Sequence, residues 1–177
     1  MVKLKVYLVG SIQDDKAGGM LWRDRLEEQL KELGFDALNP CTAECNISLG
    51  TNVVEQKKML ENLKRGGAWE KYDEVMSNIR KSDIICVNQS AFLVLLYDHT
   101  KHYGGTVHEI VEAWQKHIPI LTVSYSALTE FNDWILSLLR ENMQAGGKIF
   151  PNFKQLLEHI EHEYKDYIKS IKEIVPQ

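Results

Sequence analysis

Residues 5–12 read KVYLVGSI, a short apolar run that ends near a Gly-Ser pair. A run of this length and composition, stopped by small residues, predicts a buried strand over 3–9 with a turn after it. In residues 20–33, leucines recur at i, i+4 and i+7 while arginine and glutamate fill the other face, which predicts an amphipathic helix. Residues 35–38 predict a second short strand, so the chain opens with a strand, a helix and a strand.

The alternation of strands and helices continues along the chain. The pattern predicts helices at 53–64, 69–81, 106–116, 131–143 and 153–174, and strands at 84–88 and 120–123. The apolar run at 92–97 fits a strand or a loop, because a short apolar run does not reveal its period. Residues 46–52 are expected to form a loop.

This order of elements is typical of an α/β domain with a parallel sheet. We expect a single doubly wound domain over 1–177, of the Rossmann or flavodoxin type. Its mainly parallel sheet should have about five strands, with helices on both faces. The helix expected at 153–174 is a candidate oligomer contact or capping element.

Composition narrows the class of protein. The chain has 177 residues, enough for one domain with a substantial core. Its net charge of −4 argues against dedicated binding to a nucleic-acid polymer, but not against a small phosphorylated ligand. The longest apolar run, at 91–97, is too short to span a membrane, and no signal peptide is recognisable. Three cysteines do not suggest a disulfide framework, so a cytoplasmic location is expected.

The expected fold localises the search for a site, because ligands of open α/β sheets bind beyond the carboxyl ends of the strands. The segments expected there are 10–19, 39–45, 88–105 and 124–132. Among them, the polar stretch that runs into the helix at Gly104, Gly105 and Thr106 is the densest in functional groups.

Glu109 follows these glycines, which allow a backbone to approach a ligand closely. The helix N-terminus offers free N–H groups and favours an ionised carboxylate, as attack on a sugar C1′ requires. The alternative is a capping box, in which Thr106 and Glu109 only satisfy the backbone of the first turn.

The strand that opens the chain carries two further candidates. Ser11 is suited to bind a phosphate or a sugar, and the Tyr7 hydroxyl to lie near the reacting carbon; alternatively, Tyr7 is a core aromatic and Ser11 a turn residue. The glycines match neither a dinucleotide fingerprint nor a phosphate loop, and no cofactor is expected. Cys41 and Cys45 lack a second ligand pair, so no metal site is expected either. Cys86, inside an apolar run, is expected to be an inert thiol.

Four segments together resemble the nucleoside 2-deoxyribosyltransferase family, which includes the related 2′-deoxynucleoside 5′-phosphate N-hydrolases. They are 5–12, 79–88, 104–113 and 117–120, and the resemblance extends from residue 3 to about residue 155. It implies that Glu109 is the nucleophile that attacks C1′ and displaces the base, with Tyr7 beside it. A second base, or water, then releases the sugar with net retention.

The resemblance also implies a set of substrate-binding residues and an assembly. A homo-oligomer with shared active sites is implied, because residues 132–134 resemble the stretch that a neighbouring subunit lends to the site. The implied partner is a nucleoside or nucleoside monophosphate. The substrate-binding positions are Gly10, Ser11, Ile12, Asn88, Gly104, Gly105, Thr106 and Asn132.

The chain departs from the family pattern at two positions. Val75 stands where the family has an aspartate that handles the leaving base, and Asp98 is our candidate for that role, with Glu74 behind it. Tyr103 stands where the transferases have an acid and the nucleotide hydrolases a serine. These departures leave open the base and the choice between nucleoside and nucleotide.

The sequence therefore predicts a deoxyribosyltransferase-like enzyme that forms a glycosyl-Glu109 intermediate. The alternatives are a 2′-deoxynucleoside 5′-monophosphate N-glycosidase and, from another class, an inactive nucleotide-binding sensor. A structural subunit in which Glu109 only caps a helix is the plainest alternative. A phosphoribohydrolase of the lysine decarboxylase-like family ranks lower, because the chain lacks the proline and extra glycine of that motif.

Overall fold

A computed structural model describes residues 3–12, 19–42 and 53–174, with side chains described up to residue 171. Its centre is a five-stranded, all-parallel sheet with the strand order β2-β1-β3-β4-β5. This arrangement confirms the predicted α/β fold of the Rossmann or flavodoxin type. The strands are β1 (Lys5–Gly10), β2 (Asp36–Leu38), β3 (Phe92–Tyr97), β4 (Ile120–Ser124) and β5 (Lys148–Phe150).

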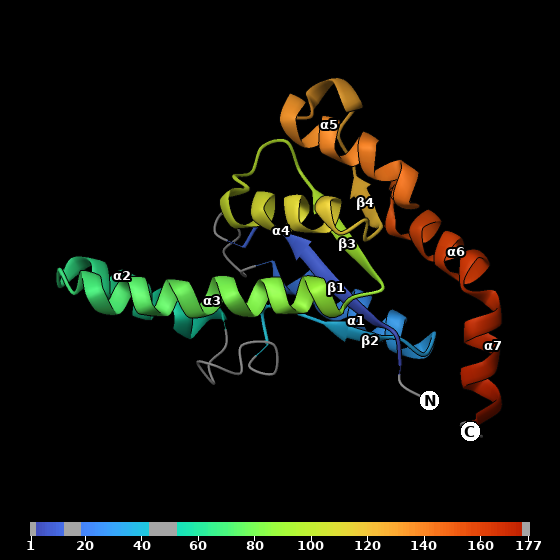
Figure 1. The fold of residues 1–177 in the computed structure, drawn as a ribbon, viewed down its shortest axis with the longest axis horizontal. Helices are drawn as coiled ribbons and strands as arrows, with labels where there is room; N and C mark the ends of the chain where they lie inside the picture. Colours follow the sequence, from blue (N-terminus) through green and yellow to red (C-terminus); the bar gives the residue numbers. More distant parts are fainter. Residues whose placement is uncertain (1–2, 13–18, 43–52, 175–177) are drawn as a thin grey trace.

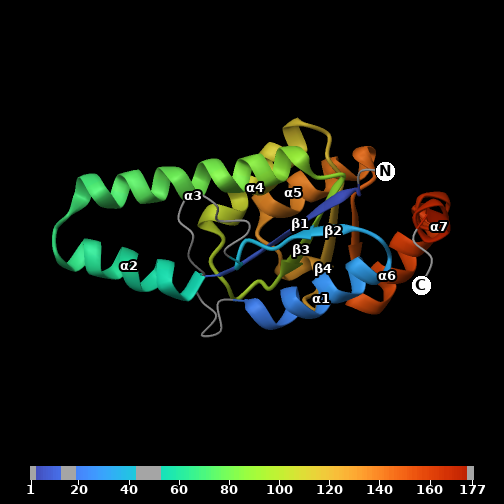
Figure 2. The same cartoon turned by 90° about the horizontal axis from the view of Figure 1, so that it is seen from below.

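Helices cover both faces of the sheet (Figures 1 and 2). One face carries α3, α4 and α5, and the other carries α1 and α6, with α7 at the end of the chain. An antiparallel hairpin of α2 and α3 extends well beyond the sheet (Figure 2). The helices are α1 (Met20–Glu32), α2 (Val53–Arg65), α3 (Trp69–Gln89), α4 (Gly104–Gln115), α5 (Asp133–Asn142), α6 (Phe153–Glu163) and α7 (Lys165–Ile174).

The pleat of β1 decides which side chains face which helices. Val6 and Leu8 pack in the core under α1 and α6, whereas Tyr7 and Val9 pack in the core under α3, α4 and α5. Successive residues of a strand point to opposite faces, so this division follows from the sequence of β1. It places Tyr7 on the face of the sheet that is covered by α4, the helix that carries Glu109.

The strand predicted at 84–88 is wrong, because these residues form the last turns of α3. Residues 84–87 are four consecutive apolar residues, and so short a run suits a buried strand as well as a turn of a buried helix. In the helix, Cys86 and Val87 are buried against the sheet, while Ile85 is 55% exposed. The buried strand is instead β3, the run at 92–97 for which strand and loop were both open.

The end of the chain also differs from the sequence pattern. The short strand β5 was not predicted, and the single helix expected at 153–174 is two helices that meet at Tyr164. The Tyr164 ring lies 5.0 Å from the ring of Phe92 and 5.5 Å from that of Phe35. This segment therefore packs on the domain's own core.

No helix among the described residues combines the length and the apolar character needed to cross a bilayer.

Asn142, at the end of α5, ties that helix to the start of β4. Its side chain is 2% exposed, accepts a hydrogen bond from the Ile120 N–H at 2.7 Å and donates one to the Ile118 carbonyl at 2.9 Å. Truncation leaves a buried N–H without its partner, so N142A should lower the free energy of unfolding by about 2 kcal/mol. Urea unfolding measures this loss. The exposed helix residue Asn62 is the control, and N142A being as stable as N62A would contradict the prediction.

Candidate functional site

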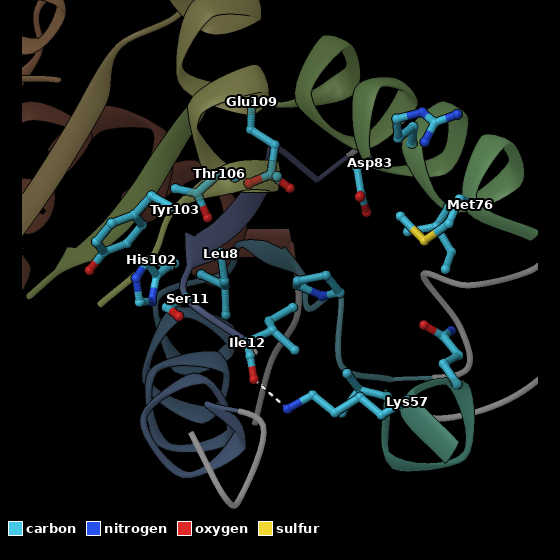
Figure 3. Close-up of a pocket in the computed structure, with 18 of the residues that line it drawn as sticks. Leu8, Ser11, Ile12, Lys57, Met76, Asp83, His102, Tyr103, Thr106 and Glu109 are labelled. Atoms are coloured by element: carbon cyan, nitrogen blue, oxygen red, sulfur yellow. Dashed lines mark hydrogen bonds between the residues drawn. The ribbon is translucent and has the colours of Figure 1, made fainter. Parts of the chain in front are cut away.

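The strand order creates a crevice at the carboxyl ends of β1 and β3. The chain proceeds from β1 to one side of the sheet, to β2, and later to the other side, to β3, and ligands of doubly wound folds bind at such a switch point. A cavity of about 200 Å³ lies there (Figure 3). Its walls come from the end of β1, the start of α4 and the α2–α3 hairpin. The residues that line it include Gly10, Ser11, Ile12, Arg23, Gln56, Lys57, Asp83, Thr106 and Glu109.

Two carboxyl groups face this cavity, and one tyrosine lies against both. The Tyr7 hydroxyl donates a hydrogen bond to Glu109 Oε1 at 2.8 Å and lies 3.1 Å from Asp83 Oδ1. Tyr7 is fully buried and Glu109 is 8% exposed. The three side chains come from β1, α4 and α3, so the fold brings together residues that are far apart in sequence.

The two contacts of the Tyr7 hydroxyl bear on how the two carboxyl groups are protonated. A tyrosine hydroxyl carries one proton, so it donates to only one of the two carboxyl oxygens. The other contact is a hydrogen bond only if that carboxyl is protonated and donates to the Tyr7 oxygen. The arrangement therefore fits a pair of carboxyl groups that share one proton.

Burial has the same effect on both carboxyl groups. It raises the pKa of Glu109 to about 8, with a further contribution from the charge of Asp83. Burial also raises the pKa of Asp83 to about 6, against the lowering effect of the Tyr7 hydrogen bond. The Tyr7 pKa is raised well above its usual value, first by burial and then by the Glu109 charge, so the hydroxyl keeps its proton. The pair consequently holds one proton between about pH 6 and about 8.

Tyr7 also offers a path for that proton. When Glu109 is protonated it donates to the Tyr7 oxygen, and the Tyr7 hydrogen points to Asp83. Transfer of both hydrogens along these bonds leaves Glu109 ionised and Asp83 protonated. The site can therefore present a carboxylate nucleophile next to a carboxylic acid at one cavity.

These pKa shifts predict a pH-dependent stability. A carboxyl whose pKa is higher in the folded than in the unfolded state stabilises the fold at low pH, and this contribution is lost as the pH rises through the folded-state value. For Glu109 the loss occurs between about pH 4.5 and about 8. E109Q should lack this loss, so its Tm should rise relative to the wild type from pH 5 to pH 8.5. Parallel Tm curves for the two proteins would contradict the raised pKa; E112Q, on the same helix, is the control.

The capping alternative for Glu109 does not hold. The helix α4 begins at Gly104, so Glu109 lies in its second turn, and the N-cap residue Tyr103 makes no side-chain capping bond. The Glu109 carboxyl instead bonds with Tyr7. The Tyr103 ring stacks on Tyr97, and its hydroxyl accepts a hydrogen bond from the Asp98 N–H.

The start of α4 leaves polar groups directed at the cavity. Thr106 is 5% exposed, and its labelled side chain points to the same region as Ser11 and His102 (Figure 3). The Ser11 hydroxyl is buried without a hydrogen-bond partner among the described residues. A Cβ on Gly104 or Gly105 would meet nothing within 4 Å. A helix N-terminus with open space and hydroxyl groups around it suits a sugar or an anionic group.

The opposite wall belongs to the α2–α3 hairpin, which the sequence did not connect with the site. Gln56, Leu60 and Met76 line this side. The Lys57 ammonium donates a hydrogen bond to the Ile12 carbonyl and so ties α2 to the segment after β1 (Figure 3). Apolar side chains at helical spacing in both helices were the available signal, although nothing in the sequence said that they face a cavity.

Three of the predicted site residues lie away from this cavity. Asp98 does not line it; its carboxylate accepts hydrogen bonds from the Thr100 N–H and hydroxyl, which lower its pKa, and it borders a separate surface depression. Asn88 is exposed near the end of α3, a consequence of the helix that replaces the predicted strand. Asn132 is exposed and caps α5 by accepting from the N–H groups of Trp134 and Ile135.

Asp83 is a carboxyl of this site that the sequence pattern did not predict. Val75 is 2% exposed in the core, and the Glu74 carboxylate pairs with Lys71 on the exposed side of α3. Cys41 is buried, whereas Cys45 lies outside the described residues. In the described part of the chain, no three His, Cys, Asp or Glu side chains converge as a metal site would require.

Comparison with known proteins supports the fold alone. No protein-family model matches the chain, and no curated protein matches its sequence. A similar solved structure is described as the crystal structure of a conserved protein from Enterococcus faecalis V583. The two chains are 19% identical with a TM-score of 0.61, over 92% of this chain and 99% of that chain.

Proposed function

We propose that the chain is an enzyme of the nucleoside 2-deoxyribosyltransferase type, which cleaves the N-glycosidic bond of a deoxynucleoside and transfers the sugar to another base. The observation that carries the proposal is the Tyr7 hydroxyl held between Glu109 and Asp83 at the switch point of the sheet. Double displacement at a sugar carbon needs a carboxylate nucleophile and a group that gives and takes one proton. This pair supplies both.

In the first step, a Glu109 carboxylate oxygen attacks C1′ as the bond from C1′ to the base nitrogen breaks. Asp83 donates its proton to the departing base and becomes a carboxylate. In the second step, a nitrogen of the incoming base attacks C1′ and loses its proton to Asp83, and the bond to Glu109 breaks. The enzyme returns to its initial state, and two inversions give net retention at C1′.

Asp83 supplies an acid to the proposed site, although not at the position where the family pattern has its aspartate. That position is Val75, counted four residues before Ile79, and its side chain is buried. Asp83 lies eight residues further along the same helix, α3, and lines the cavity. The absence of an acid at position 75 had motivated the sensor hypothesis, which loses that support.

The positions of the two carboxyl groups orient the substrate in the cavity. Because Asp83 must reach the leaving base, the base belongs on the side of the α2–α3 hairpin. The sugar then belongs over Glu109, with its 5′ end toward Ser11 and Thr106. Apolar side chains of Leu60 and Met76 suit the faces of a planar base.

A substrate panel tests the proposal. The purified protein is incubated with each deoxynucleoside and each 5′-monophosphate, with and without a second free base, and the products are separated by chromatography. Base exchange that depends on the second base is the expected result. No released or exchanged base from any substrate would overturn the proposal. E109Q serves as the inactive control and E112Q as the matched active one.

The hydrolase alternative has one observation in its favour. The Ser11 hydroxyl without a partner, the nearby Thr106 and the open start of α4 form a polar end to the cavity that suits a 5′-phosphate. In the same panel, release of base from monophosphates without an acceptor base would favour this alternative over the transferase. Exchange from nucleosides alone would favour the transferase.

A further inference from the structure

Arg23 is a fully buried cation beneath the cavity. Its side chain is 0% exposed, although arginine is almost never fully buried unless its charge has partners. The helix pattern had placed the arginines of α1 on the polar face. Position 23, however, continues the stripe of Leu26 and Leu30 one turn toward the N-terminus, and all three side chains are buried.

The guanidinium group bonds to the end of β1 and to the residue that precedes α1. Its Nη2 donates to the Gly10 carbonyl at 2.9 Å, and its Nη1 donates to the Gly19 carbonyl at 2.9 Å. Its Nε donates to the Leu8 carbonyl at 3.2 Å, within β1 itself. The planar fork of an arginine can satisfy several carbonyls in fixed directions, which a lysine ammonium on a flexible stem cannot do.

The conformation of Gly19 belongs to the same arrangement. Its φ is +68°, in the left-handed region that favours glycine. A Cβ at this position would lie 2.4 Å from Arg23 Nη1 and 2.9 Å from the Ser11 carbonyl oxygen. The glycine thus makes room for the guanidinium at the point where α1 begins.

We infer that Arg23 is a positioning residue of the proposed reaction, which fixes the end of β1 just before Ser11 and Ile12 and places a permanent positive charge at the cavity that Glu109 and Asp83 line. The inference rests on the proposed function. Ser11 and Ile12 follow Gly10 directly and line the cavity, so the carbonyl that Arg23 holds is the last one before the substrate-facing residues.

The charge of Arg23 acts on the carboxyl pair. It lines the same cavity and lowers the pKa of both Glu109 and Asp83, against the larger effect of burial. This favours the ionised nucleophile at lower pH. The other titratable or charged groups around the pair or lining the cavity, among the described residues, are Tyr7 from β1, Cys86 and Arg80 from α3, His108 from α4, His102 before α4 and Lys57 from α2. They remain in place when only Arg23 is changed.

Two variants separate position from charge. R23K keeps the cation but loses the fork, so its KM should rise by about tenfold while its pH profile stays that of the wild type. R23M removes the charge at similar volume, so the acid side of its pH profile should also move to higher pH. If R23M does not fold, R23Q replaces it. An unchanged KM in R23K overturns the positional role, and an unmoved acid side in R23M overturns the electrostatic one.

A measurement without substrate keeps this inference separate from the proposed function. The stability of the wild type should fall as the pH rises through the folded-state pKa values of the pair. In R23M the fall should extend to higher pH, whereas in R23K it should match the wild type. Identical pH dependence in all three proteins counts against the role of the charge even if the wild type is active. A shifted dependence supports it even if no substrate releases a base.

Discussion

E109Q should lose at least about 10³-fold in the rate of base release or exchange, because an amide cannot act as the nucleophile that the proposed reaction requires. Glutamine has the shape of glutamate and can still accept the hydrogen bond from Tyr7, so the fold should be unchanged. The rate is measured at saturating deoxynucleoside, and circular dichroism checks the fold.

The control for E109Q lies on the same helix. Glu112 does not line the cavity, and E112Q should keep the wild-type rate within about twofold. A second readout follows from the covalent step: mass spectrometry of the wild type under turnover should detect a deoxyribosyl adduct that E109Q never forms. E109Q with wild-type activity would remove Glu109 from the reaction.

D83N should slow the reaction by about 10²- to 10³-fold for bases that need a proton to depart, because an amide does not protonate a leaving group. The loss should depend on the base. A 7-methylated guanine already carries a positive charge and leaves without protonation, so D83N should retain most of the rate with that substrate. The rates of both substrates in D83N and in the wild type measure this difference.

Two other aspartates provide controls for D83N. D73N changes an exposed aspartate of α3 and should have no effect. D98N changes the residue that the sequence pattern favoured for this role. Since Asp98 lies outside the cavity, D98N should keep the wild-type rate, and a loss in D98N but not in D83N would return the role to Asp98.

The helices and strands that could be predicted are those long enough, or bounded clearly enough, for the spacing of their apolar residues to identify the element. The helix α1 and the strand β1 were expected within one or two residues of their observed bounds, because leucine spacing and a bounded apolar run are local signals. Residues 84–88 show the limit. Five residues cannot display a period of 3.6, and only the packing of Cys86 and Val87 under the sheet decides for the helix.

The parts of the candidate site that could be predicted are those whose residues lie close together in the sequence. The start of α4 with Glu109, and the end of β1 with Tyr7 and Ser11, each lie in one short segment. Asp83 was not predictable, because its place depends on where a helix ends and a strand begins. The role of Arg23 could not be predicted for a different reason. A charged residue on a predicted helix is normally expected to be solvent-exposed, and Arg23 meets its three carbonyl partners only in the folded chain.

The two edges of the sheet bear on how the protein behaves in a crowded solution. The edge strands β2 and β5 have three residues each, and each begins with an exposed charged residue, Asp36 or Lys148. A long, flat, uncharged edge is a template onto which another chain adds strands, whereas short charged edges discourage such growth. The apolar strands β1, β3 and β4 lie inside the sheet, so the segments with the greatest tendency to form fibrils stay shielded for as long as the two edges remain in place.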